Sequence, residues 1–109
     1  MKSDNNYLEH ILDAIDLIED FLDDMDLESF KNNKMASAAV VRELEIIGEA
    51  SNNLSEKFKR ENPNMPLRDA IDMRNFLIHE YFGVDINIVW RTCKEDLPML
   101  KEFIKEHLQ

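Results

Sequence analysis

Apolar residues recur at three- and four-residue spacing along most of the chain, which is the spacing of one face of an α-helix. The first stripe predicts a helix from about Asp4 to Met25, and the second predicts a helix from about Asn33 to Arg60, with a short connector over residues 26–30. The first stripe consists of Leu8, Ile11, Leu12, Ile15, Ile18, Leu22 and Met25, and the second of Val40, Val41, Leu44, Ile47, Ser51, Leu54 and Phe58.

The second half of the chain is divided by proline and glycine. Two prolines and two asparagines in residues 61–66 predict a break, after which Pro66 suits the first turn of a third helix that runs to about Tyr81 or Phe82, with Gly83 as its stop. Asp85 is a candidate N-cap for a fourth helix, and Pro98 predicts a kink within it. No alternation typical of strands is present, so we expect an all-α, up-and-down bundle of four to five helices forming a single domain over residues 1–109.

Gly48 interrupts the apolar stripe of the second predicted helix. Glycine inside a helix costs about 1 kcal/mol relative to alanine, and it usually marks a place where a neighbouring helix approaches closely. Close packing around Gly48-Glu49-Ala50 is the simpler interpretation, and a direct functional role for Glu49 is the alternative.

The net charge of −10 is concentrated at the start of the chain. Residues 1–30 hold ten acidic side chains and one lysine, so the remaining residues are close to neutral. This distribution disfavours extended RNA binding but leaves room for a local basic pocket. The acidic stretch is either a solvated helix face or a docking surface for a partner.

The composition also restricts the location of the protein. The N-terminus is polar and carries no signal peptide pattern, and the longest apolar run, Ala36 to Val41, is far shorter than a membrane span. The one cysteine, Cys93, cannot form an internal disulfide. We therefore expect a soluble, cytoplasmic protein with no membrane association.

Residues 74–81, Arg-Asn-Phe-Leu-Ile-His-Glu-Tyr, contain the side chains best suited to chemistry on RNA. An arginine binds phosphate through a planar fork of donors, and a histidine exchanges protons near neutral pH. Asn75 and His79 share a helical face, whereas Arg74 and His79 lie about 140° apart around the axis. Two copies of this helix crossing at a dimer axis would bring both residue types into one cleft.

Each of these residues also has an ordinary structural interpretation. His79 could cap the end of its helix, and Arg74 could pair with Glu80, Asp72 or an acidic residue of the first helix. Tyr81 could be a core aromatic. The sequence has no Glu-x-x-His or His-Glu-x-x-His motif, no paired cysteines and no glycine-rich phosphate loop, so we expect no metal and no cofactor.

The ordered set of motifs resembles the HepT-like branch of the HEPN domains, which are small helical ribonucleases. The family signature, Arg followed four to six residues later by His and then by Tyr two positions on, is matched by Arg74, His79 and Tyr81. The resemblance covers essentially the whole chain. It also rests on Tyr7-Leu8-Glu9-His10-Ile11-Leu12, Ile46-Ile47-Gly48-Glu49-Ala50, Met73-Arg74-Asn75, Val89-Trp90 and Asp96-Leu97-Pro98.

This resemblance implies a homodimer that forms through the motif helix and builds one metal-independent endoribonuclease site. In it, His79 would be the general acid or base, Arg74 would bind the phosphate, and Asn75 would orient His79 or contact the substrate, which would be transfer RNA or message. It further implies a toxin–antitoxin system in which an MNT-type nucleotidyltransferase antitoxin neutralises the toxin by transferring AMP to Tyr81. A non-catalytic adaptor dimer that binds such a nucleotidyltransferase or presents its substrate, and a plain structural bundle, are the competing hypotheses.

Overall fold

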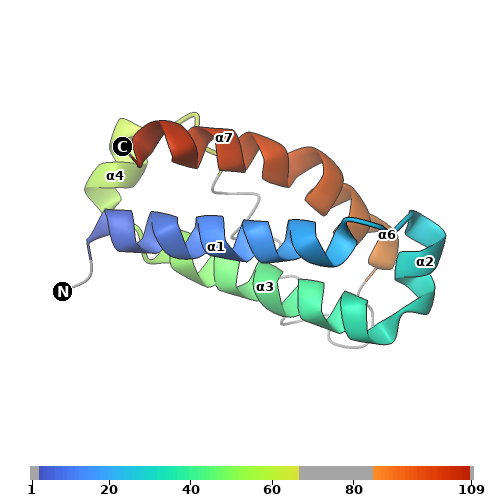
Figure 1. Cartoon of the computed structure of the whole chain (residues 1–109). Coiled ribbons are helices and arrows are strands. Elements are labelled where there is room, and N and C mark those ends of the chain that lie inside the picture. The colour runs from blue at the N-terminus through green and yellow to red at the C-terminus, as the bar shows by residue number, and fades with distance from the viewer. Residues whose placement is uncertain (1–2, 67–84, 109) are drawn as a thin grey trace.

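Helices make up the regular structure of the chain in a computed structural model that describes residues 3–66 and 85–108. Across these two ranges no strand occurs, which confirms the all-α prediction. Figure 1 shows α1, α3 and α7 lying lengthwise, with α4 at one end of the bundle and α2 and α6 at the other. In chain order the elements are α1 (Asp4–Leu22), α2 (Leu27–Asn32), α3 (Lys34–Asn52), α4 (Glu56–Glu61), α6 (Ile86–Arg91), the π-helical turn η1 (Thr92–Asp96) and α7 (Leu97–His107).

The first helix, α1, begins where the sequence predicts. The side chain of Ser3 accepts a hydrogen bond from the backbone N–H of Asn6 and so caps the first turn. The helix ends at Leu22, three residues before the predicted end, and the N–H of Met25 turns back to the Leu22 carbonyl at 3.0 Å. The predicted apolar stripe is buried except for Leu12 and Met25, which are half-buried. The helix α3 runs antiparallel to α1 (Figure 1).

The prediction of a connector over residues 26–30 is wrong, because this stretch begins the short helix α2. The carboxylate of Asp26 caps α2 by accepting from the Ser29 N–H at 2.8 Å. Phe30 is fully buried, and its ring centroid lies 5.4 Å from that of Trp90 in α6. A helix of six residues is too short to show periodicity, so its contact with α6 has no signature in the sequence.

The prediction of one helix from Asn33 to Arg60 is also wrong, since α3 ends at Asn52 and a separate helix, α4, begins at Glu56. Ser55 caps α4 by accepting from the Phe58 N–H at 3.0 Å. In addition, the Asp4 carboxylate accepts hydrogen bonds from both the N–H and the hydroxyl of Ser55, each at 2.8 Å. This contact joins the start of α1 to the break between α3 and α4.

The fourth predicted helix is interrupted close to the predicted position. Asp85 caps α6 through the N–H of Asn87 at 2.9 Å, as expected. Residues Thr92–Asp96 then form the π-helical turn η1, in which the N–H of Leu97 bonds to the Thr92 carbonyl. Pro98 follows in the first turn of α7, a position where proline is tolerated.

The core is a single cluster to which every long described helix contributes. The apolar face of α1 packs against α3 on one side and α7 on the other. Outside the core, Lys101 of α7 binds Asp16 and Glu19 of α1 and so joins these two helices at the surface.

Among the described helices, none is long and apolar enough to cross a membrane. The largest fully buried apolar side chains are Phe30, Leu8, Ile11, Ile15, Ile18, Leu44, Ile47, Ile104, Val40 and Val89.

Candidate ribonuclease site and family

The residues predicted to perform chemistry lie outside the described part of the chain. Arg74, Asn75, His79 and Tyr81 all fall within residues 67–84, as does the third predicted helix beyond Pro66. Their geometry and the predicted dimer contact through this helix therefore stay predictions. The structure does describe the two ends to which this segment is joined.

The chain approaches the segment through an anchored turn after α4. Asn62 donates from its side-chain amide to the Phe58 carbonyl at 2.9 Å, and the N–H of Met65 bonds to the Asn62 carbonyl at 3.2 Å. Met65 is buried in the core. The predicted break at residues 61–66 is confirmed, and its last described residues are held in place by α4.

The chain resumes at the opposite end of the bundle. Asp85 is exposed and caps α6, whose residue Val89 is fully buried. Trp90, also in α6, packs on Phe30 of α2. Because α4 and α6 lie at opposite ends of α1 and α3 (Figure 1), the first described range ends at one end of the bundle and the second begins at the other.

The Gly48-Glu49-Ala50 motif lies in α3. Gly48 and Ala50 are buried while Glu49 is exposed, which agrees with close packing around the glycine and leaves a role for Glu49 untested. One turn further, the Ser51 side chain is fully buried, and its hydroxyl has no hydrogen-bond partner among residues 3–66 and 85–108. A buried unpaired hydroxyl is uncommon because it loses its bonds to water without replacement.

His107 has a structural role that sequence reasoning missed. Its Nε2 lies 2.9 Å from the Asn62 Oδ1 and its Nδ1 lies 3.0 Å from the Phe103 carbonyl, with the ring stacked on Phe103 at 4.3 Å between centroids. The i, i+4 spacing of Phe103 and His107 in the last turn of a helix was the available signal. His10, by contrast, is exposed on α1 and meets the edge of Tyr7.

The thiol of Cys93 is not equipped to act as a nucleophile. Burial raises its pKa to about 12, with the neighbouring Lys94 opposing this shift and Asp96 adding to it. The side chain therefore carries its proton at neutral pH, and a thiol is a far weaker nucleophile than a thiolate. In residues 3–66 and 85–108, no three His, Cys, Asp or Glu side chains are grouped as metal ligands would be.

Comparison with known proteins places this helical bundle in a class. The architecture is that of a HEPN-like helical domain, and the model of the family described as "Ribonuclease HepT-like" matches residues 11–107. The chain belongs to the Ribonuclease HepT-like family. The match includes residues 74–81.

Curated relatives are similar over nearly the whole chain. A probable ribonuclease HepT of Thermococcus cleftensis is 50% identical over 100 residues, which cover 92% of this chain and 91% of the relative. A putative RNase of Caldanaerobacter subterraneus subsp. tengcongensis is 39% identical, with 100% and 97% of the two chains covered. A third relative, a gamma-glutamylcyclotransferase and putative RNase of Methanocaldococcus jannaschii, is 43% identical over 44% of its length. No solved structure gives a significant match.

Proposed function

We propose that this protein is a metal-independent endoribonuclease that acts as the toxin of a toxin–antitoxin system. The observation that carries the proposal is the family match, which spans Arg74, His79 and Tyr81 in their expected order. Relatives named as ribonucleases at up to 50% identity support the activity. The structural role of His107 and the protonated thiol of Cys93 remove two other residues as candidates for the reaction.

The proposed reaction needs only groups of the protein, RNA itself and water. The ribose 2′-hydroxyl attacks the adjacent phosphorus, the bond from phosphorus to the 5′-oxygen breaks, and a 2′,3′-cyclic phosphate forms. His79 accepts the 2′ proton or donates one to the leaving 5′-oxygen, water exchanges the other proton, and Asn75 orients the His79 ring or contacts the substrate. Arg74 binds the phosphate and stabilises the charge that develops in the transition state.

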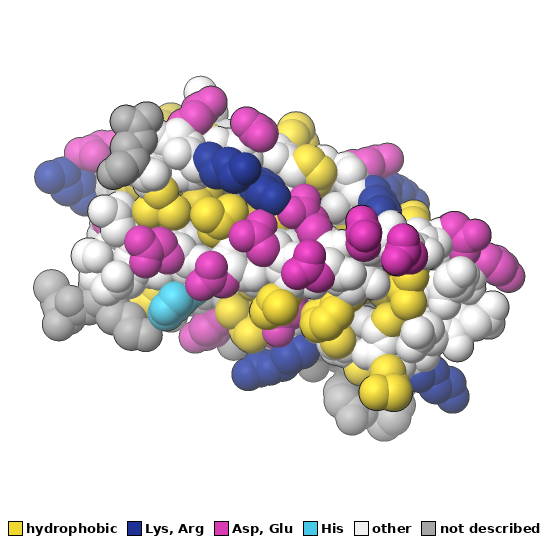
Figure 2. Space-filling view, in the orientation of Figure 1, with side chains coloured by type: hydrophobic (Ala, Val, Ile, Leu, Met, Phe, Trp, Pro, Cys, Tyr) yellow, Lys and Arg dark blue, Asp and Glu magenta, His cyan; other side chains and the backbone are white. Residues whose placement is uncertain are grey.

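The proposed site is shared between two subunits. Arg74 and His79 are separated by about 140° around one helix, so they converge more readily across a two-fold axis than within one chain. A homodimer formed through the motif helix supplies this arrangement. The RNA then approaches away from α1, whose exposed carboxylates repel a phosphate backbone (Figure 2).

Control of the toxin is proposed to act on Tyr81. An MNT-type nucleotidyltransferase antitoxin transfers AMP from ATP to the phenol oxygen and releases pyrophosphate. The added nucleotide places bulk and negative charge two residues from His79. RNA is then excluded by steric overlap and by repulsion. Intact mass of the protein co-expressed with the antitoxin, compared with Tyr81→Phe, tests this step: AMP-sized increments on the wild type alone support it.

A non-catalytic adaptor is the second candidate function. It is favoured by the acidic surface, since a chain with a net charge of −10 is a poor general binder of RNA. In this case the dimer positions a nucleotidyltransferase partner or presents its substrate, and His79 performs no proton transfer.

A cleavage assay in EDTA with purified protein separates the two functions. His79→Ala and Arg74→Ala should each lower cleavage by roughly a hundredfold or more. His10→Ala and Arg42→Ala are matched controls because both side chains are exposed on described helices, and they should cleave like the wild type. Equal cleavage by the wild type and both site variants would refute the site. Absence of cleavage by every protein, with retained binding of the nucleotidyltransferase, would favour the adaptor.

A further inference from the structure

Three large apolar side chains are exposed on the antiparallel helices α1 and α3. Leu17 and Phe21 in α1 are 45% and 38% exposed, and Met35 in α3 is 85% exposed. These three residues are called the α1–α3 patch. The two helices are antiparallel, so the C-terminal half of α1 lies beside the first turn of α3 (Figure 1). Figure 2 shows apolar side chains along this face, next to the acidic ones of α1.

Leu17 and Phe21 are one helical turn apart, so they point to the same side of α1. This side is distinct from the buried stripe that includes Ile11, Ile15 and Ile18. An apolar row with one-turn spacing on a surface helix fits the side chains of another helix packed against it. Neither Leu17 nor Phe21 belongs to the buried core cluster.

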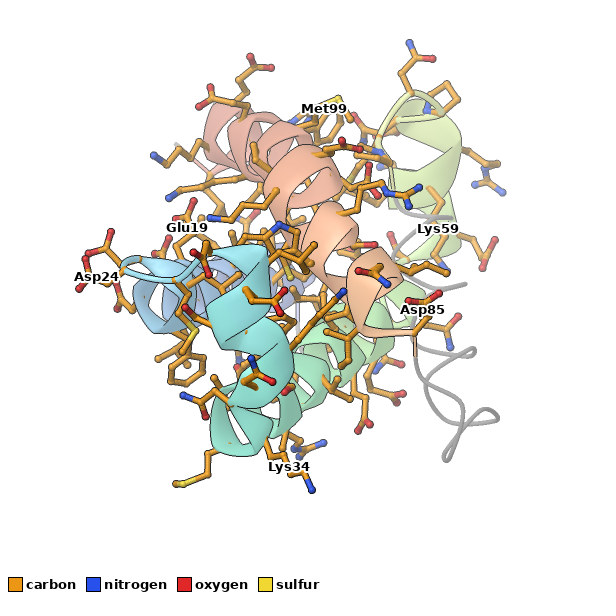
Figure 3. The ribbon with its side chains drawn as sticks, turned by 90° about the vertical axis from the view of Figure 1, so that its right-hand side faces the viewer. Glu19, Asp24, Lys34, Lys59, Asp85 and Met99 are labelled. Atoms are coloured by element: carbon orange, nitrogen blue, oxygen red, sulfur yellow. The ribbon has the colours of Figure 1, made fainter. Side chains whose placement is uncertain are left out.

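The carboxylates of α1 fall into two groups. Asp16 and Glu19 face α7, where Lys101 neutralises them. Asp13, Asp20 and Asp24, here called the acidic edge, lie three or four residues from Leu17 and Phe21 and are exposed. No ion pair joins the acidic edge to a basic side chain in the described ranges, and Figure 3 shows Asp24 pointing away from the bundle.

Basic residues on the α3 side do not balance this edge. Arg42 is paired with Glu45 at 3.6 Å, and Lys34 points outward at the first turn of α3 (Figure 3). The border of the patch is therefore acidic along α1 and nearly balanced along α3. Such a border repels RNA and disfavours a second copy of a chain that carries a net charge of −10.

From this combination we infer that the α1–α3 patch and its acidic edge bind a basic amphipathic helix of a different protein. Apolar side chains of that helix cover Leu17, Phe21 and Met35, while its lysines or arginines pair with Asp13, Asp20 and Asp24. The inference goes beyond the proposed ribonuclease function and does not depend on it, because every residue involved lies in α1, α3 or the turn after α1.

The test uses an 18-residue peptide probe with leucines on one helical face and lysines on the other, and a scrambled peptide of equal composition. The full chain, labelled with 15N, is titrated with each peptide while its amide NMR spectrum is recorded. Chemical-shift changes should be grouped around Leu17, Phe21 and Met35, and only with the helical peptide. Shifts centred on Met99, which is 60% exposed on α7 among Glu102 and Glu106, would overturn the inference, as would equal binding of the scrambled peptide.

Variants separate the apolar and charged contributions. Leu17→Ser with Phe21→Ser should weaken binding about tenfold or more. Asp20→Asn with Asp24→Asn should weaken it and reduce its dependence on salt. Met99→Ser is the matched control and should bind like the wild type. Met35→Lys repels the peptide without disturbing the core, because Met35 is almost fully exposed, and so it keeps the test valid if the double serine variant unfolds.

The oligomeric state distinguishes a foreign helix from a second copy. Sedimentation of the wild type and of Met35→Lys without peptide should give the same mass. A lower mass for Met35→Lys would show that the patch binds another copy of this chain and would overturn the inference. If the ribonuclease proposal holds, Met35→Lys should cleave RNA as fast as the wild type. The cleavage assay therefore tests the ribonuclease proposal, and the peptide titration tests the docking proposal separately.

Discussion

The Nε2 atom of His107 lies 2.9 Å from the Oδ1 atom of Asn62, and this contact joins the last turn of α7 to the turn that follows α4. The orientation of the Asn62 amide is fixed, since its Nδ2 donates to the Phe58 carbonyl at 2.9 Å. Oδ1 is therefore the atom presented to the ring, and Nε2–H donates to it. The ring itself stacks on Phe103 and meets the edge of Phe58. His107 thus holds the C-terminal end of α7 against the turn after α4.

The first prediction concerns the coupling between these two residues. His107→Ala and Asn62→Ala should each lower the free energy of unfolding, and the double variant should lose less than the sum because both changes remove the same hydrogen bond. A coupling of about 1 kcal/mol is expected from urea unfolding of the four proteins. Additive losses would show that the contact contributes nothing. His10→Ala, an exposed histidine outside this contact, is the control and should be near neutral.

The second prediction concerns Lys101, whose ammonium group contacts both Asp16 and Glu19. Hydrogen bonds from Lys101, first to Glu19 and then to Asp16, raise its pKa above the ordinary value. A raised pKa means that the folded state holds the proton more tightly. The stabilisation is therefore fully present below the pKa of the unfolded chain and is lost as pH rises through the higher pKa of the folded state.

Lys101→Met should accordingly lower stability by about 0.5 to 1 kcal/mol at neutral pH, the usual range for a surface ion pair. The difference from the wild type should stay constant from pH 6 to about 9 and should shrink above about pH 10, where the lysine begins to lose its proton. Urea midpoints measured across this range check the sign. Lys105→Met is the control, since Lys105 is exposed on the same helix, and it should show no such dependence.

The third prediction concerns the reactivity of Cys93. Because burial raises the thiol pKa to about 12, almost no thiolate is present at pH 8 and the sulfur is also covered. Iodoacetamide should label the native protein much more slowly than the urea-unfolded protein at this pH. Mass spectrometry of the intact chain measures both rates. Similar rates for the native and unfolded protein would contradict the burial of Cys93 in the core.

The long helices were predictable from the sequence because their apolar stripes are long. The stripe beginning at Leu8 and the stripe beginning at Val40 each extend over several turns, and most of their residues are buried as expected. Capping by Asp85 and the disruption before Pro98 also follow from local chemistry, since each depends on residues next to one another in the chain. The sequence predicts structure less well wherever the deciding contact comes from a distant element.

Two elements show this limit. Phe30 is buried against Trp90 of α6, which lies about sixty residues further along the chain. Residues 26–30 contain no pattern that predicts this contact. At the break after α3, Ser55 is bonded by Asp4, which lies 51 residues earlier in the chain. For the proposed site, the motif residues were recognisable by type and spacing, but their convergence depends on a second subunit and stays a prediction.

The last prediction tests the break between α3 and α4. The Asp4 carboxylate accepts two hydrogen bonds from Ser55, and Ser55 in turn caps α4. Asp4→Ala should therefore lower the free energy of unfolding by about 1.5 kcal/mol, since a hydrogen bond to a charged group contributes more than one between neutral groups. Ser55→Ala should cost a similar amount, and the two losses should not add.

Asn5→Ala is the matched control for this test, because Asn5 is exposed in the same turn of α1 and is not among the described residues that bond to Ser55. If Asp4→Ala and Asn5→Ala lose equal stability, the contact with Ser55 does not hold α4 in place. If Asp4→Ala alone is destabilised, hydrogen exchange should also become faster at the N–H of Phe58, whose partner is the Ser55 hydroxyl. A faster exchange confined to α4 would locate the effect at the break, because the core stripe of α3 is buried independently of Asp4.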